Sequence, residues 1–448
     1  MNRKYAYISL VGFTAVFFII ILIFSKNPED KIPPFKERTG TIALGSEWLN
    51  SKKAMEGLLA AIAQNPKDYK SMIALTQAYI QESRTTGDYA YYDKAGLELL
   101  DKVLKNNPKN FDALTLKSLI YLSQHHFSDA LGVAKQAQAI NPYNAFIYGE
   151  LDDSYLELGR YDSAVMMADK MVSVRPDLRS YARVSYLREI YGDLPGAISA
   201  IKLAVSAGYP GLEQTEWARM ILEHLYEITG KLDSANMVCV RALQERPDYP
   251  FAIAALGRLE EAKGNYAQAI TYMEKAKGMI IEYSFRDALT DLYRLNNEPT
   301  KGDQSANDVI DELGGNLGDE SQSIHGHYAD KELAYAYLKT NPPDLDKALK
   351  HALTEYDRRP DNIDVCEAVA WVRYKRGEFA QADTLINKAI MRTHSKNPVL
   401  LCQAGLIKIK AGEKDKGAEL IKEAVQQDPY FDINLRKEAS AYLPADIK

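Results

Sequence analysis

Apolar residues recur with helical spacing along most of the chain. Between residues 250 and 283, for example, they fall three or four positions apart in two successive runs. The first run is Ile253, Leu256, Leu259 and Ala262, and the second is Ala269, Met273 and Ala276. No stretch of comparable length alternates between apolar and polar residues, as a half-buried strand does. The pattern therefore predicts an all-α protein.

The first residues carry a different pattern. Residues 8–24 are a run of seventeen whose only polar members are Ser9 and Thr14, and the short flank at residues 1–7 contains Arg3 and Lys4. A helix of this length spans about 26 Å, which is near the lower limit for a bilayer core. The run is not followed by the small-residue site that a cleaved signal peptide needs. We therefore predict an uncleaved transmembrane signal anchor at residues 8–24.

Lysine and arginine lie on both sides of this predicted span, so the positive-inside rule does not settle its orientation. A short basic N-terminus directly before a long apolar run is the usual layout of an exported anchor. We therefore expect one pass through the inner (plasma) membrane, with the large domain extracytoplasmic, in the periplasm. Residues 25–46, which contain Pro28, Pro33 and Pro34, are expected to form an extended tether.

Glycine, small residues and proline recur about every 34 residues after Trp48. A glycine is followed five positions later by a small residue, as in Gly159 and Ala164. Two helices joined by a tight turn explain this pair, because glycine ends the first helix and the small residue lets the second approach it closely. Proline then ends the unit, since it cannot continue a helix. The proline series is Pro108, Pro142, Pro176 and Pro210, and further glycines of this kind are Gly192, Gly230, Gly264, Gly377 and Gly412.

One of these units closely resembles the tetratricopeptide repeat (TPR). The matching residues are Tyr148, Leu151, Tyr155, Gly159, Tyr161, Ala164, Ala168 and Pro176. Residues 250–283 are similar, although Glu260 and Asp152 depart from the family pattern. The resemblance covers most of residues 47–443. It implies about ten helix pairs stacked as an all-α, TPR-type α-solenoid, a right-handed superhelix.

The repeats are expected to form two blocks. Residues 47–313 make the N-terminal block, with a long-looped first repeat around residues 84–92 and a degenerate repeat at its end. Residues 314–325 are rich in glycine and acidic residues, which is typical of a loop. Residues 326–430 make the C-terminal block. Residues 431–448 are expected to be a capping helix and tail that cover the apolar face of the last repeat.

Composition narrows the possible functions. The 448 residues include 55 Lys and Arg against 61 Asp and Glu, a net charge of −6, which argues against a nucleic-acid partner. The chain contains no glycine-rich phosphate loop, no G-x-S-x-G and no H-E-x-x-H. We therefore predict that the protein is not an enzyme and has no cofactor. The three cysteines, Cys239, Cys366 and Cys402, share no short spacing and are expected to be buried.

No metal site is predicted, although two histidines come nearest to one. His325 and His327 follow the acidic loop, with Asp330 and His351 downstream, but their spacing is not a recognised ligand pattern. The pair at residues 125 and 126 falls at an expected inter-helix turn, where solvated polar side chains are usual.

The TPR resemblance implies that the first helices of the pairs line a concave groove that binds a protein or peptide. Aromatic side chains and arginines there suit peptide recognition, and the arginines offer hydrogen bonds to an acidic or C-terminal carboxylate. The competing interpretation is that many of these aromatic residues pack between helices. Mapped onto this chain, the groove residues are Phe146, Asp153, Arg179, Arg183, Tyr186, Trp217, His224, Phe251, Arg258, Trp371, Tyr374 and Lys375.

The sequence is compatible with three functions. The first is a non-catalytic, membrane-anchored TPR scaffold that binds a protein or peptide in its groove, in envelope assembly or secretion. The second is a cytoplasm-facing regulatory adaptor, similar to the membrane-anchored repeat protein that controls lipopolysaccharide synthesis, whose paired C-x-x-C motifs are absent here. The remote third is an enzyme-associated or metal-binding TPR protein. The chain also resembles bacterial multi-TPR proteins of unassigned activity, through residues 180–189 and 370–371.

Overall fold

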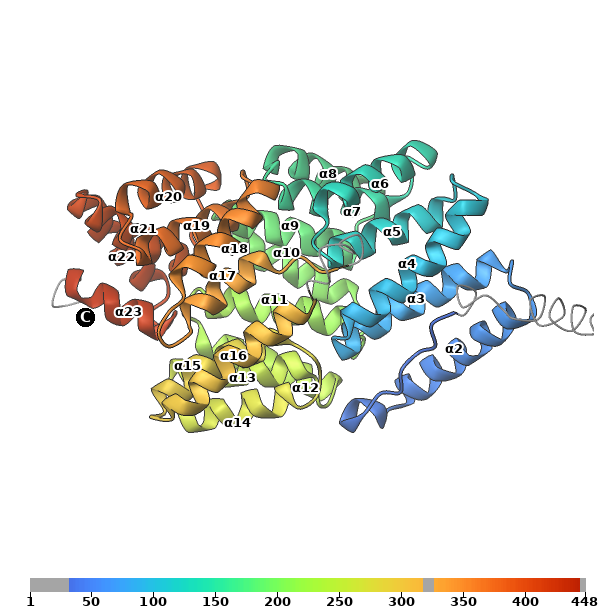
Figure 1. Cartoon of the computed structure of the whole chain (residues 1–448), viewed down its shortest axis with the longest axis horizontal. Helices are drawn as coiled ribbons and strands as arrows, with labels where there is room; N and C mark the ends of the chain where they lie inside the picture. Colours follow the sequence, from blue (N-terminus) through green and yellow to red (C-terminus); the bar gives the residue numbers. More distant parts are fainter. Residues whose placement is uncertain (1–31, 317–325, 444–448) are drawn as a thin grey trace, which may run out of the picture. The chain divides into compact units, whose positions relative to one another are not determined.

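The computed structural model describes residues 32–316 and 326–443, and the described residues from 37 onward belong to one compact unit. Within the described ranges the chain forms helices and no strand, which confirms the all-α prediction (Figure 1). No helix in these ranges is long and apolar enough to cross a bilayer. The predicted anchor at residues 8–24 lies outside the described residues.

The described part of the chain forms ten consecutive helix pairs, an all-α solenoid of the TPR type. They are preceded by η2 (Gly40–Ala43) and α2 (Ser46–Gln64), and followed by α23 (Ile433–Ala439) and η4 (Ser440–Tyr442). The pairs are α3 (Tyr69–Thr86) with α4 (Tyr89–Asn106), α5 (Phe111–Ser123) with α6 (Phe127–Ile140), α7 (Ala145–Glu157) with α8 (Tyr161–Val174), α9 (Leu178–Ile190) with α10 (Leu194–Ala207), α11 (Glu213–Glu227) with α12 (Leu232–Glu245), α13 (Pro250–Ala262) with α14 (Tyr266–Lys277), α15 (Tyr283–Leu295) with α16 (Pro299–Asn316), α17 (Asp330–Leu338) with α18 (Leu345–Arg358), α19 (Ile363–Lys375) with α20 (Phe379–Thr393), and α21 (Pro398–Lys410) with α22 (Lys414–Gln427).

Local sequence signals place the helix boundaries. The side chains of Asn110 and Asp177 accept hydrogen bonds from backbone N–H groups in the first turns of α5 and α9. Just after the C-terminal end of α7, the first helix of its pair, Gly159 adopts a left-handed conformation with φ +71°. Ala164, five residues later, is fully buried against the first helix of its pair. The repeat unit therefore has the structure that its marker residues predict.

Two predicted loops are helical instead. The first repeat has no long loop, because α3 and α4 are each 18 residues long and only Gly87 and Asp88 join them. This repeat is longer than the usual 34 residues, and its extra residues lengthen both helices rather than the turn between them. The expected loop at residues 314–325 also begins later, since α16 continues to Asn316. The rest of that segment, residues 317–325, lies outside the described residues.

Part of the predicted tether packs on the repeats. Arg38 is only 7% exposed, and its guanidinium forms a bidentate pair with Glu82 of α3 at 2.7 and 2.8 Å. Burying an arginine is favourable only when a carboxylate compensates its charge, so this pair fixes residue 38 in place. Trp48 of α2 lies beneath the same guanidinium, 5.1 Å from it. The chain from residue 37 onward is therefore part of the array and not an extended spacer.

Residues about six repeats apart contact each other. Tyr161 Oη accepts a hydrogen bond from Ile363 N at 2.8 Å, across 202 positions. The Gln427 side chain bonds the Ile228 carbonyl at 3.4 Å, across 199 positions. Six units of about 34 residues give the same separation, so one turn of the solenoid takes about six repeats and successive turns touch. In Figure 1 the orange helices α17 to α20 accordingly lie beside the teal and green helices α5 to α9.

Gly159 serves both the inter-helix turn and this contact between successive turns of the solenoid. A Cβ atom on Gly159 would lie 2.3 Å from the carbonyl carbon and oxygen of Asp361, the residue one turn onward. Real Cβ atoms do not approach backbone so closely, so the backbone at this turn would have to move. Gly377 occupies the same place in its own repeat with φ +79°, but a Cβ there would meet nothing within 4 Å.

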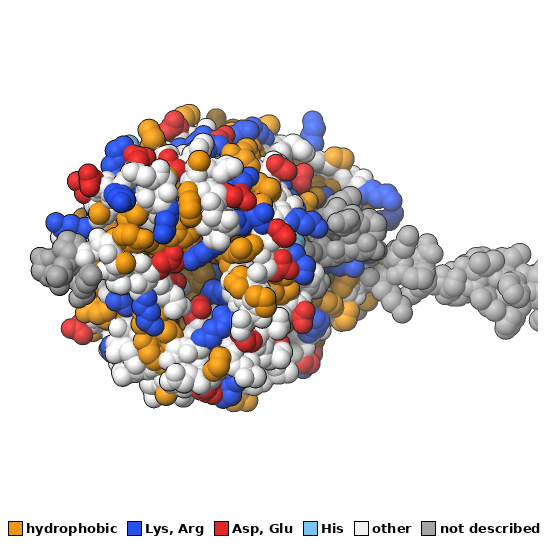
Figure 2. Space-filling view, turned by 60° about the vertical axis from the view of Figure 1, so that its left-hand side comes forward, with side chains coloured by type: hydrophobic (Ala, Val, Ile, Leu, Met, Phe, Trp, Pro, Cys, Tyr) orange, Lys and Arg blue, Asp and Glu red, His pale blue; other side chains and the backbone are white. Residues whose placement is uncertain are grey.

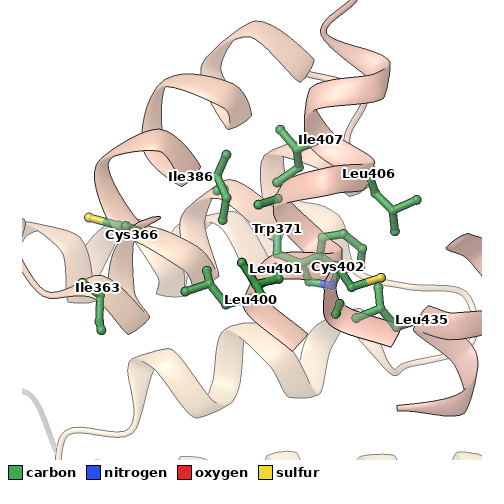
Figure 3. Packing of buried hydrophobic residues seen from close by; sticks show 14 of the residues in the cluster. Ile363, Cys366, Trp371, Ile386, Leu400, Leu401, Cys402, Leu406, Ile407 and Leu435 are labelled. Atoms are coloured by element: carbon green, nitrogen blue, oxygen red, sulfur yellow. The ribbon is translucent and has the colours of Figure 1, made fainter. Parts of the chain in front are cut away.

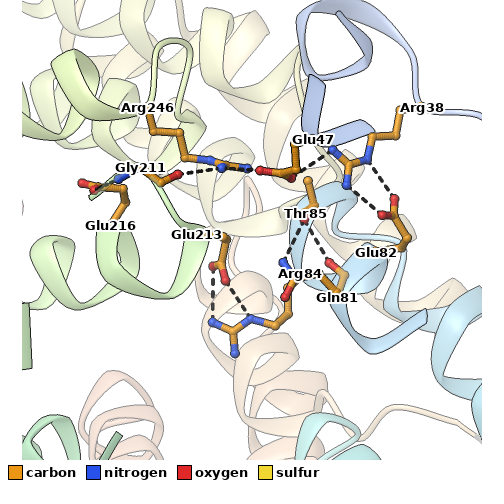
Figure 4. Close-up of polar contacts among 10 residues, drawn as sticks. All are labelled: Arg38, Glu47, Gln81, Glu82, Arg84, Thr85, Gly211, Glu213, Glu216 and Arg246. Atoms are coloured by element: carbon orange, nitrogen blue, oxygen red, sulfur yellow. Dashed lines mark hydrogen bonds and ion pairs between the residues drawn. The ribbon is translucent and has the colours of Figure 1, made fainter. Parts of the chain in front are cut away.

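A network of ion pairs joins the first repeat to the fifth. Glu47 of α2 pairs with Arg38 at 3.2 Å and with Arg246, which follows α12, at 2.6 Å (Figure 4). Beside it, Arg84 of α3 pairs with Glu213 of α11 at 3.1 Å. These contacts hold α2 and α3 against α11 and α12, so the first turn of the solenoid is closed on itself.

Apolar clusters fill the space between neighbouring pairs. The cluster that covers the C-terminal repeats includes Trp371 from α19, Leu401 and Cys402 from α21 and Leu435 from α23 (Figure 3). The short helix α23 thus covers the apolar face of the last pair. Cys239, Cys366 and Cys402 are all buried, as expected, and none of them is in a disulfide.

We predict that Gly159→Ala destabilises the protein more than Gly377→Ala. Both variants force alanine into the left-handed region, at a cost of about 1–2 kcal/mol. Only Gly159→Ala also displaces backbone one solenoid turn away, which adds about 1–3 kcal/mol by the usual cost of overpacking. Thermal unfolding of both variants by circular dichroism measures the difference. Equal losses of melting temperature would show that the contact between turns does not contribute to stability.

Candidate functional site

The first helices of seven successive pairs line one cavity of about 1200 Å³. These helices are α3, α5, α7, α9, α11, α13 and α15. Figure 2 shows that the described part of the chain is hollowed near the centre of one face, with apolar side chains on the floor and charged side chains around it. The cavity contains eight of the twelve predicted groove residues, namely Phe146, Arg179, Arg183, Tyr186, Trp217, His224, Phe251 and Arg258.

Helical spacing brings these side chains onto one face of each helix. On α9, Arg179, Arg183 and Tyr186 lie at positions i, i+4 and i+7, and a capping box at Asp177 fixes where the helix begins. Tyr186 is 39% exposed, and Trp217 on α11 is 42% exposed. Both line the cavity, so their exposed surface is available to a bound molecule rather than used in helix packing.

Ion pairs connect each first helix to the next one along the cavity wall. Arg183 of α9 forms a bidentate pair with Asp153 of α7, at 2.9 and 2.5 Å. On the next two helices, His224 of α11 bonds Glu189 of α9 at 3.0 Å. Arg258 of α13 completes the series through Glu223 and Glu227 of α11, at 2.7 and 2.9 Å. Two of the three arginines expected to receive a carboxylate are therefore already paired within the wall.

Arg179 differs from them, because within the described residues its guanidinium has no carboxylate partner closer than 4 Å. It lies over the ring of Phe146, 4.9 Å from the ring centroid, a cation–π contact. Burial, and after it the nearby charge of Arg183, lower the pKa of Arg179 from its usual value. Arg179 is the cavity cation best placed to interact with a bound anion.

The cavity also contains a carboxyl group that sequence reasoning missed. Glu150 on α7 is completely buried, and neither of its carboxyl oxygens has a hydrogen-bond partner in the described structure. Burial, with a further contribution from Asp153, raises the pKa of Glu150 to about 8, so it is protonated at neutral pH. The available signal was the close run of three acidic residues at 150, 152 and 153 on a helix whose preceding residues, 145–149, carry no charge. Asp152 is likewise buried, and burial raises its pKa to about 8.

Trp371, Tyr374 and Lys375 do not reach this cavity. Trp371 and Tyr374 are stacked on each other, 4.8 Å apart, and both are buried in the C-terminal cluster. Tyr374 Oη donates to Glu438 at 2.7 Å, and Lys375 Nζ contacts the same carboxylate at 2.8 Å. The capping helix α23 therefore covers the face of α19 that would have lined a groove.

The histidines nearest to a metal site are packed in the protein instead. Within residues 32–316 and 326–443, no three His, Cys, Asp or Glu residues are placed to hold a metal ion, and His325 lies outside these ranges. His327 packs against His125, with 4.2 Å between the ring centroids. His125 Nδ1 and His126 Nε2 lie 2.7 and 2.6 Å from the carbonyl oxygens of Tyr328 and Gly326. The expectation of solvated histidines at this turn was wrong, because the next turn of the solenoid covers them.

Comparisons with known proteins give the following. The chain matches no protein-family model and no curated protein. Among solved structures, it is similar to a TPR protein from Parabacteroides merdae, with 17% identity, a TM-score of 0.42, and coverage of 56% of this chain and 93% of that one. It is also similar to TTC0263, a TPR protein of Thermus thermophilus, with 21% identity, a TM-score of 0.37, and coverage of 43% and 97%. A chain of the APC/C hetero-tetramer Cut9–Hcn1 gives 14% identity, a TM-score of 0.42, and coverage of 86% of this chain and 75% of that one.

Acid should destabilise the protein through the histidine pair. Burial above all lowers the pKa of His125 and of His327 to about 3, so both rings are neutral in the folded chain and take up protons near pH 6.5 when it unfolds. Stability is therefore lost as pH falls from about 6.5 toward 3, by up to about 1.4 kcal/mol per pH unit for each ring.

We predict that the double variant His125→Asn/His327→Gln loses less melting temperature than wild type between pH 6.5 and 4.5. Asparagine is chosen at residue 125 because it tolerates the left-handed backbone there, with φ +62°. Differential scanning calorimetry over this range makes the comparison. The same pH slope in both proteins would show that these rings are not the groups that titrate on unfolding.

Proposed function

We propose that this protein is a non-catalytic scaffold whose cavity binds an extended segment of a protein partner. The observation that carries the proposal is the cavity of about 1200 Å³. The first helices of seven successive repeats line it, and all of them except α3 contribute aromatic side chains. Its volume exceeds the range of roughly 300–1000 Å³ that is usual for small-ligand sites. Aromatic residues with free surface, such as Tyr186 and Trp217, supply rigid contact area at little cost in entropy.

The proposal includes a location. The apolar run at residues 8–24, preceded by Arg3 and Lys4, supports a single membrane-spanning anchor. The short basic flank before a long apolar run favours a repeat domain on the extracytoplasmic side of the inner membrane. An anchored scaffold on that side suits envelope assembly or secretion, because it holds its partner close to the bilayer.

Partner capture by the full-length protein should depend on the cavity aromatics. We predict that Tyr186→Ala/Trp217→Ala weakens binding of the captured partners at least tenfold, because both side chains present free surface to the cavity. Affinity purification with quantitative mass spectrometry measures the loss. The matched control is Tyr143→Ala/Tyr209→Ala, at exposed loop positions that are 86% and 78% accessible and outside the cavity. If both double variants retain the wild-type set of partners, the cavity is not the binding site.

The topology is tested separately by protease accessibility. We predict that protease added to intact spheroplasts digests the repeat domain, because that domain is proposed to face away from the cytoplasm. Immunoblotting against a C-terminal epitope follows the digestion, and a cytoplasmic protein serves as the control for lysis. Digestion of the repeat domain only after lysis would favour the cytoplasm-facing adaptor instead.

A further inference from the structure

The described array begins with half a helix pair, and this half is α2. A repeat ends in a proline, and a small residue stands twelve positions before it, as with Ala164 and Pro176. Ala54 and Pro66 have the same spacing, so α2 is in the register of a second helix. No first helix precedes it within the described part of the chain, because residues 32–45 contain only the short helix η2. In Figure 1, α2 accordingly lies at the edge of the array beside α3.

The face of α2 that would contact the missing first helix is exposed. In complete repeats the small residue is fully buried, as at Ala130 and Ala164. Ala54 is exposed, although Trp48 and Met55 on the opposite side of α2 are buried. The ends of repeat arrays usually present a polar surface to water. An exposed packing face at this end therefore suggests that another helix covers it.

The exposed face has the residue spacing of a helix–helix contact. Its seam follows steps of four, three and four residues, through Asn50, Ala54, Gly57 and Ala61. Leu49, which is 64% exposed, lies beside this seam. A Cβ atom on Gly57 would meet nothing within 4 Å, so the space over the middle of the seam is open. A second helix can therefore approach closely there and cover the leucine.

The charges beside the seam indicate which helix fits. Lys53 and Glu56 are exposed on the same side of it, and neither forms an ion pair within the described residues. The neighbouring Lys52, by contrast, is paired with Glu37 at 2.5 Å. An acidic helix would be repelled by Glu56, and a basic helix by Lys53. A helix that offers one lysine and one glutamate in the reverse direction would pair with both, and α2 itself is such a helix when it is turned antiparallel.

We propose that the outer face of α2 docks against α2 of a second copy of this chain, as an antiparallel pair with two-fold symmetry. When Ala54 of one copy lies against Gly57 of the other, Lys53 of each copy lies within two residues of the level of Glu56 in the other. Two residues are about 3 Å along a helix, which these long side chains can span. The symmetry gives this ion pair twice, and it uses the same face of both copies, so the contact closes at two.

The proposed membrane anchor would strengthen this contact. Residues 25–36 separate the apolar run from the array, and they reach at most about 40 Å when extended. Two anchored copies would therefore hold their α2 helices in one layer near the bilayer, which raises the effective concentration of one for the other. Only this step rests on the proposed location, because the docking face itself is formed by described residues.

The test is cross-linking of the full-length protein in the cells that express it. Ala54→Cys places a thiol on the seam, whereas Cys239, Cys366 and Cys402 are buried. A short, membrane-permeant bismaleimide joins two such thiols when helices pack at their usual distance of about 8–10 Å. We expect Ala54→Cys to give a covalent dimer on denaturing gels. The matched control is Ser199→Cys, at an exposed position of α10, which should remain monomeric.

Charge reversal in the Ala54→Cys background tests whether the partner is a second copy. Lys53→Glu or Glu56→Lys alone should lower the cross-linked fraction at least threefold, because each replaces two attractive contacts by two repulsive ones. Co-expression of these two variants with different epitope tags should restore the dimer between them, since every contact then joins a lysine to a glutamate. Lys109→Glu, in the exposed loop after α4, controls for net charge and should behave as the parent. Thermal melts of the purified variants confirm that each is folded.

Four results would overturn the inference. Equal cross-linking of Ala54→Cys and Ser199→Cys would indicate random collisions. Dimers that neither charge reversal weakens would exclude the antiparallel pairing. A cross-linked product with the mass of another protein would identify a different partner. A monomeric Ala54→Cys that also resists maleimide labelling would show that this chain's own residues cover the face. None of these results bears on capture by the cavity, which the variants of its aromatic residues test separately.

Discussion

The contact between successive turns of the solenoid constrains every other part of this structure. In a repeat array each unit usually contacts only its neighbours. Here residues about six repeats apart also touch, so the inter-helix turns must fit against backbone that lies one full turn away. At Gly159 this leaves no room for a Cβ atom beside Asp361. The same contact buries His126 and covers part of His125, which in an open array would both face water.

Closure of the first solenoid turn also determines how enclosed the candidate site is and how its charged side chains are paired. When α2 and α3 are held against α11 and α12 by Arg84, Glu213, Glu47 and Arg246, the concave surface becomes the wall of a cavity. Charges on such a wall are partly removed from water, and they need partners. This explains why Arg183 and Arg258 are paired with carboxylates of the neighbouring helix. Arg179 and Glu150 differ from these arginines, because neither forms an ion pair or a side-chain hydrogen bond within the described residues.

Several tyrosines both fill space between helices and form a hydrogen bond through their hydroxyl group. Tyr161 packs at a position that defines the repeat, and its hydroxyl also accepts the hydrogen bond from Ile363 N one turn onward. Tyr148 is buried, and its hydroxyl donates to the Pro142 carbonyl within the loop before α7. A tyrosine can fill the space between two helices while its polar end satisfies a buried backbone group. The abundance of tyrosine, 29 residues, is consistent with a protein in which many loops are covered.

The repeat could be recognised from the amino-acid sequence because its marks are local. A glycine such as Gly159, a small residue five positions later and a cap such as Asp177 act within a few residues, so their spacing predicts the helix pairs. The same local spacing places Arg179, Tyr186 and Trp217 on first helices, since it decides which side chains share a face. By contrast, long-range packing decides which of these side chains have an ion-pair or packing partner within the protein. Whether an arginine is paired, a histidine covered or an aromatic residue of α19 capped depends on segments 30 to 200 positions away, which local spacing does not encode.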